Sequence, residues 1–258
     1  MDDPFLEKVQ MQVLDFATDK RTQWESKHQL YSVIFELTPR CNFNCVHCYL
    51  HDHHRSDELP YDEIIRIIDI LYEKEVLFIT FTGGDIFTRK DFLDIYLYAK
   101  RKGFIIELYT NGALITEKDI QVFSQYPPLL VDISLYGSCE ETYRKVTGIS
   151  GAFEKVISNI KSLLAAGVRV SVKAPVLNLY YHELPQIKQI AEDFNIPFRT
   201  GFEIFPSIDN DSSVQDYAVS LKDSLRYEFA EFDKRPRTFG EDEDAEYVDL
   251  VKERPLFR

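Results

Sequence analysis

Short apolar runs alternate with longer segments in which apolar positions recur at helical spacing, from about residue 31 onward. The short runs are rich in β-branched and aromatic residues, which is typical of strands. They predict strands at residues 31–38, 76–81, 104–109, 129–135, 168–173 and 198–204. The periodic segments predict helices at residues 60–74, 91–102, 116–124, 140–146, 153–166 and 181–194.

The strands read as continuous apolar runs rather than alternating ones, which favours parallel strands covered by helices. We therefore predict an α/β fold, a partial (β/α)6 TIM-like barrel of parallel strands with outer helices. An open doubly wound sheet has the same pattern and stays an alternative. Residues 1–30 predict a helical extension, 31–206 form the predicted barrel, and the rhythm is lost in the acidic segment 207–258.

Polar and small residues collect at the predicted ends of the strands. Cysteines follow the first strand, Gly83 and Gly84 the second, and Asn111 the third. Ser134 ends the fourth strand, and the run from Lys173 to Val176 closes the fifth. Ligands of parallel α/β proteins bind at the C-terminal ends of the strands, so these residues predict a site there.

Three of the four cysteines lie in one short stretch, as Cys41, Cys45 and Cys48. Pro39 ends the preceding strand, so the thiols lie on a loop and can converge on one metal centre. Soft sulfur ligands select iron–sulfur clusters, zinc or Cu(I), and a zinc site usually has four ligands. No second cysteine pair follows, although several histidines between residues 47 and 54 keep a zinc site open. A four-iron cube on three thiolates leaves one iron for a small molecule.

The chain carries a formal net charge of −13, which argues against a sequence-independent nucleic-acid binder. It contains no apolar run long enough to span a bilayer, and its acidic N-terminus lacks the pattern of a signal peptide. We therefore expect a cytoplasmic protein without a membrane or nucleic-acid partner, in a compartment where thiols stay reduced.

The spacing Cys-x3-Cys-x2-Cys followed by Tyr49 resembles the signature of radical S-adenosylmethionine (SAM) enzymes. The resemblance implies a [4Fe-4S] cluster held by Cys41, Cys45 and Cys48, with SAM bound at the open iron and Tyr49 beside its adenine. It also implies a flavodoxin- or ferredoxin-type reductant as a partner.

Further residues carry the resemblance and are predicted to bind SAM. Gly83, Gly84 and Asp85 resemble a Gly-Gly-Glu motif that holds the SAM amino group, with Asp in place of Glu. The segment around Ser134 resembles a fourth-strand Ser-Leu-Asp-Gly motif, with Tyr136 replacing the Asp. We list the remaining predicted contacts to SAM as Asn111, Arg144 and Val176.

The run from Tyr136 to Ile157 looks most like the radical SAM subgroup that modifies ribosomally made peptides. Members of that subgroup commonly carry a cysteine-rich SPASM extension with auxiliary clusters, and no cysteine follows Cys139. We interpret the acidic segment 207–258 as a solvated tail or as the truncated start of such an extension. The leading hypothesis is an enzyme that cleaves SAM reductively and modifies a peptide. The alternatives are a radical SAM enzyme acting on a small molecule or cofactor precursor, and a non-catalytic iron–sulfur or zinc-binding partner protein.

Overall fold

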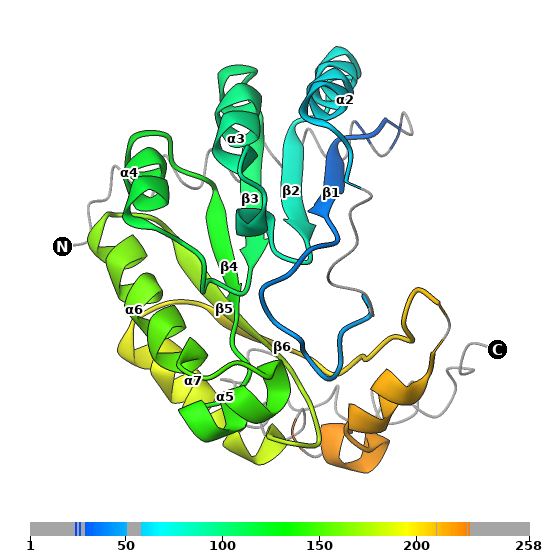
Figure 1. Cartoon of the computed structure of the whole chain (residues 1–258), viewed down its shortest axis with the longest axis vertical. Coiled ribbons are helices and arrows are strands. Elements are labelled where there is room, and N and C mark those ends of the chain that lie inside the picture. Colours follow the sequence, from blue (N-terminus) through cyan, green and yellow to red (C-terminus); the bar gives the residue numbers. More distant parts are fainter. Residues whose placement is uncertain are drawn as a thin grey trace, which may run out of the picture. The chain divides into compact units, whose positions relative to one another are not determined.

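The apolar runs pair side by side as one parallel sheet of six strands (Figure 1). The computed structural model describes residues 24, 26, 29–50, 58–209, 211–225 and 227. The strands are β1 (Ser32–Thr38), β2 (Phe78–Gly83), β3 (Ile105–Thr110), β4 (Leu130–Ser134), β5 (Val170–Pro175) and β6 (Phe198–Gly201). Their spatial order follows the sequence from β1 to β6, without the reversal of a doubly wound sheet. The predicted partial barrel is therefore confirmed.

A helix follows most strands, and α2, α3, α4 and α6 succeed one another around the sheet (Figure 1). The α-helices are α2 (Tyr61–Glu73), α3 (Phe92–Arg101), α4 (Glu117–Gln125), α5 (Glu140–Thr147), α6 (Ala152–Ala165) and α7 (Leu184–Asp193). The 3-10 helices are η1 (Ile86–Thr88), η2 (Tyr181–Glu183) and η3 (Ser213–Tyr217). The segment predicted as one helix over residues 181–194 is thus η2 followed by α7, where Pro185 stands in the first turn.

The two faces of the sheet differ in burial. In β3, the fully buried Ile106 and Leu108 alternate with the half-buried Glu107 and Tyr109. Successive side chains of a strand point to opposite faces, so the apolar set packs under the helices and the polar set lies on the other face. We call this second face the inner face of the sheet.

The last strand is shorter than predicted. β6 ends at Gly201 and not at residue 204, because its pairing with β5 stops at Pro175 opposite Gly201. Within the described residues β6 pairs with no other strand, so nothing extends its ladder.

The chain divides into two compact units, Met1–Ala218 and Val219–Arg258. The first contains the whole sheet and all the helices named above, and only residues 219–225 and 227 of the second are described. The helix predicted over residues 1–30 lies mostly outside the described residues. In the part of the chain that the structure describes, no helix has the length and apolar character needed to cross a membrane.

We expect Thr116→Ala to destabilise the barrel by about 1 kcal/mol, because this residue caps a helix. The Thr116 hydroxyl accepts a hydrogen bond from the Asp119 backbone, and the Asp119 carboxylate accepts one from the Thr116 backbone. Urea unfolding measures the loss, and Thr116→Ser, which keeps the hydroxyl, is the control. Equal stability of the alanine and serine variants would contradict a capping role.

Candidate metal and SAM site

The three clustered cysteines line one cavity of about 190 Å³ at the C-terminal ends of the strands. We call residues 39–50 the cysteine loop and this space the inner cavity. The ends of four strands complete its wall. They contribute Thr82, Gly83, Gly84, Tyr109, Thr110, Asn111, Ser134, Tyr136 and Lys173. The strand-end convergence predicted from the topology is thus present.

The glycine pair holds the start of the cysteine loop against β2. The Gly84 amide donates to the Thr38 carbonyl at 2.7 Å, and the Asp85 amide donates to the Arg40 carbonyl at 2.8 Å. A Cβ on Gly83 or Gly84 would lie 2.2 Å from one of these carbonyl oxygens. Both positions therefore require glycine because of the backbone they pack against, while both also line the inner cavity.

The other side of the cysteine loop is fastened to the end of α5. The Asn44 and Val46 amides donate to the carbonyls of Thr147 and Val146, at 2.9 and 3.0 Å. Carbonyls in the last turn of a helix have no partner within the helix, so the loop satisfies two of them.

Aromatic rings fill the space between the cysteine loop and β4. Phe43, only 2% exposed, meets Tyr136 and Tyr143 edge-on, with ring centroids 6.3 and 6.2 Å apart. The His47 ring lies 5.4 Å from Tyr136. These contacts bury Phe43 and pack the cysteine loop against Tyr136, which also hydrogen-bonds Cys45.

The three thiols are half-buried and lack a compensating charge. Burial raises the pKa of Cys41 to about 12 and also raises the pKa values of Cys45 and Cys48. The charges of Asp85 and of the Cys48 thiolate raise the pKa of Cys41 further, and the thiolates of Cys41 and Cys48 raise the pKa of Cys45. A bound metal centre reverses this effect, because a coordinating thiol is deprotonated. Three soft donors on one cavity fit an iron–sulfur cluster. Across the described residues, no group of three or more histidine, cysteine or carboxylate side chains is arranged to hold a single metal ion, whereas the thiolates of a cluster each bind a different iron.

His47 is a candidate that the sequence analysis did not assign to SAM. Its ring lines the inner cavity, and its buried Nδ1 has no hydrogen-bond partner among the described residues. Burial lowers its pKa to about 4, so the ring is neutral at pH 7. A buried polar atom without a partner is rare, and here it leaves Nδ1 as a hydrogen-bond acceptor at the wall of the inner cavity.

Some predicted SAM contacts lie at the cavity. Tyr49, Gly83, Gly84, Asn111 and Ser134 line it. The side-chain amide of Asn111 also donates to the Asn42 side chain at 2.8 Å and to Cys41 Sγ at 3.7 Å, so it supports the cysteine loop. The Tyr49 hydroxyl donates to Glu36 at 2.7 Å.

The structure does not bring three predicted contacts to the inner cavity. Arg144 is exposed on α5, because Tyr143, Val146 and Thr147 take the buried side of that helix. Val176 is fully buried and donates its amide to the Gly201 carbonyl. Asp85 is 1% exposed, and protein donors occupy its carboxylate.

The Asp85 carboxylate joins three elements. Its Oδ1 accepts from the Phe87 amide at 3.0 Å and caps η1. Its Oδ2 accepts from the Thr110 hydroxyl at 2.6 Å and the Asn111 amide at 2.9 Å. Burial raises its pKa, and these hydrogen bonds oppose the rise.

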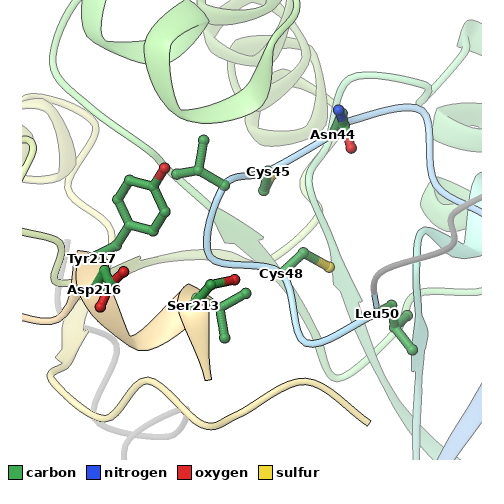
Figure 2. A pocket seen from close by; sticks show the side chains of 9 residues that line it. Asn44, Cys45, Cys48, Leu50, Ser213, Asp216 and Tyr217 are labelled. Atoms are coloured by element: carbon green, nitrogen blue, oxygen red, sulfur yellow. The ribbon is translucent and has the colours of Figure 1, made fainter. Parts of the chain in front are cut away.

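The cysteine loop also lines a second cavity, of about 270 Å³, on its other side. Figure 2 shows Cys45 and Cys48 on one wall and Ser213, Asp216 and Tyr217 of η3 on the other. Cys45 and Cys48 line both cavities, so the loop is the wall between them.

A parallel partial barrel with three thiols at its mouth is typical of a protein that binds a metal cluster. The comparison with known families supports this class. Residues 35–193 match the Radical SAM superfamily, and the chain belongs to that family. This family uses a [4Fe-4S] cluster and SAM.

Among curated relatives, Fe-coproporphyrin III synthase of Methanosarcina barkeri is 29% identical over 192 residues, covering 74% of this chain and 46% of that protein. The subtilosin biosynthesis protein AlbA of Bacillus subtilis is 29% identical over 161 residues, covering 62% and 36% respectively. The chain thus spans less than half the length of these two relatives.

Solved structures share the fold. SuiB of Streptococcus suis bound to S-adenosylmethionine superposes with a TM-score of 0.68 at 14% identity, covering 86% of this chain and 52% of that one. SuiB bound to its precursor peptide SuiA gives a TM-score of 0.61 at 13% identity, covering 88% and 53%. The anSMEcpe structure with bound AdoMet and a peptide gives 0.67 at 17% identity, covering 79% and 59%.

We expect Gly84→Ala to lower both stability and iron uptake, because its Cβ would lie 2.2 Å from the Arg40 carbonyl oxygen and displace the cysteine loop. The expected destabilisation is about 1–3 kcal/mol, as for other overpacked sites. Gly201→Ala is the control, since nothing lies within 4 Å of a Cβ there. Iron content after anaerobic reconstitution and the urea midpoint measure the effects, and wild-type iron content in Gly84→Ala would count against this role.

We expect the iron-free protein to alkylate first at Cys139, which is exposed. A raised pKa keeps the other three cysteines in the unreactive thiol form at neutral pH. Their rates should climb with pH, for Cys41 up to about pH 12. Iodoacetamide labelling followed by peptide mass spectrometry measures each rate, and equal labelling of all four near neutral pH would refute the burial argument.

Proposed function

We propose that this chain is a radical SAM enzyme that modifies a ribosomally made peptide. The observation that carries the proposal is the inner cavity, where Cys41, Cys45 and Cys48 meet the glycine turn, Asn111 and Ser134. Cys41, Cys45 and Cys48 would hold a [4Fe-4S] cluster, which would supply one electron for the reductive cleavage of SAM to methionine and the 5′-deoxyadenosyl radical that abstracts hydrogen from the substrate.

The chain's own residues supply binding and protection from water. The three thiolates hold the cluster, and the backbone at Gly83 and Gly84 leaves room beside it. The neutral His47 offers Nδ1 as an acceptor and Ser134 offers a hydroxyl group for SAM, while Tyr49, whose hydroxyl donates to Glu36, offers its ring. Asp85, whose oxygens are occupied, acts through the position of Asn111 and the turn.

A peptide substrate is supported by the structural likeness to SuiB, which was solved with its precursor peptide, and by the relative AlbA. A second candidate is a porphyrin-type cofactor precursor, which the similarity to Fe-coproporphyrin III synthase favours. Both reactions need a one-electron reductant of the flavodoxin or ferredoxin kind, and we propose that they run in the reducing cytoplasm.

The test is anaerobic formation of 5′-deoxyadenosine. Protein reconstituted with iron and sulfide, then given dithionite and SAM, should release it. Cys41→Ala, Cys45→Ala and Cys48→Ala should each reduce the product to background, because three thiolates hold the cluster. Cys139→Ala, an exposed cysteine outside the cavity, should leave it unchanged.

The other results separate the alternatives. Iron binding without product, with either substrate class present, would favour a non-catalytic cluster protein. Zinc binding without iron binding would refute the proposal.

A further inference from the structure

A polar layer crosses the inner face of the sheet below the inner cavity. Tyr109 of β3 pairs in register with Asp132 of β4, and Lys173 of β5 pairs with Arg199 of β6. The ammonium of Lys173 lies 3.9 Å from the Tyr109 ring centroid, and the Arg199 guanidinium carbon lies 5.4 Å from it. Both cations therefore stand over one aromatic ring, which attracts positive charge.

One carboxylate serves both cations. Asp132 is fully buried; its Oδ1 accepts from the Ser171 hydroxyl at 2.5 Å. Its Oδ2 accepts a hydrogen bond from Arg199 Nη2 and lies 3.4 Å from Lys173 Nζ. Within the described residues, Asp132 is the ion-pair partner of both Lys173 and Arg199.

The cations keep unused donors. A lysine has three N–H donors and an arginine five, more than the shared Asp132 oxygen and the Tyr109 side chain that also bonds Arg199 satisfy. The Arg199 side chain is 55% exposed and that of Lys173 is 27% exposed, so an incoming group reaches both. Burial lowers the pKa of Lys173, a penalty that a second anion would relieve.

Glu107, another carboxyl group near this layer, does not supply the second anion for Lys173 and Arg199. Burial raises the pKa of Glu107, and the charge of Asp132 raises it further, while Arg199 opposes the rise. Glu107 is therefore biased toward its neutral form by the same layer.

Lys173 connects this polar layer to the proposed cluster and SAM site, because it lines the inner cavity together with the three cysteines. We propose that Lys173 and Arg199 bind a carboxylate of the substrate and so position the substrate beside the site of SAM cleavage. This rests on the proposed function and specifies the substrate class. The carboxylate is an alkyl one, as in a glutamate side chain of a peptide or a propionate arm of a porphyrin.

The first experiment measures binding to the reconstituted full chain in two arms. One arm compares coproporphyrin III with its tetramethyl ester by porphyrin fluorescence. The other compares N-acetylglutamate methylamide with its glutamine analogue by saturation-transfer NMR. The acid should bind more tightly than its neutral partner in at least one arm, which also identifies the source of the carboxylate.

The variants then locate the contact. Arg199→Gln and Lys173→Gln should each weaken binding of the preferred acid by about tenfold or more, with no effect on its neutral partner. Arg199→Lys should restore part of the affinity. Arg66→Gln is the matched control, since Arg66 pairs with Glu63 on the exposed side of α2.

The carboxylate of SAM is the competing occupant, and equilibrium dialysis of labelled SAM tests it. SAM affinity should be unchanged in Arg199→Gln. Weaker SAM binding with unchanged binding of the acids would overturn the proposal, as would equal binding of acid and neutral probes by the wild-type protein in both arms.

Failure of this proposal is distinguishable from failure of the proposed function. Wild-type protein that forms 5′-deoxyadenosine from SAM alone but binds acid and neutral probes equally would refute only this proposal, whereas absence of 5′-deoxyadenosine would refute the proposed function. A melting curve for each variant separates loss of binding from loss of folding, and Arg199→Gln leaves Asp132 paired with Ser171 and Lys173.

Discussion

The backbone clamp on the cysteine loop is the constraint on which the rest of the site depends. On one side, the Gly84 and Asp85 amides donate to carbonyls at the start of the loop. On the other, carbonyls in the last turn of α5 accept the Asn44 and Val46 amides. The thiols between these anchors take no part in these four backbone hydrogen bonds, although Cys41 Sγ accepts weaker ones from the Phe43 backbone and the Asn111 side chain.

Asp85, in the turn that follows β2, has a structural role. Its short side chain reaches the amide two residues onward, as aspartate does when it caps a helix, and its second oxygen fastens the end of β3. The acid that the sequence pattern assigned to SAM thus ties β2, η1 and β3 together. The placement of Asn111, which touches the cysteine loop, follows from that bond.

The six strands could be predicted because apolar runs are a local signal. The grouping of polar residues at the strand ends could be predicted as well, because a parallel topology brings those ends to one edge of the sheet. Prediction from the sequence failed where a tertiary partner decides. β6 ends where β5 stops pairing, which no local pattern shows. Arg144, predicted to contact SAM, lies outside the inner cavity, and the sequence held part of the reason, since Tyr143, Val146 and Thr147 share one helical face and turn Arg144 outward. Lys173 and His47 carried only a weak signal, a place at a strand end and a place among histidines near the cysteines, because their contacts come from strands and a loop distant in sequence.

Burial acts on the charges of the inner cavity in opposite directions. It favours neutral thiols at Cys41, Cys45 and Cys48 and disfavours the ammonium of Lys173. Both shifts have one physical cause, since a low-dielectric space penalises any uncompensated charge. A cavity of this kind accepts charged groups in compensating sets. Metal cations stabilise the thiolates, and a second anion would stabilise a lysine and an arginine that share one aspartate. The cysteines lie at the strand ends, and Lys173 and Arg199 lie on the neighbouring inner face of the sheet. The same electrostatic rule therefore accounts for the metal ligands and for the cationic pair beside them.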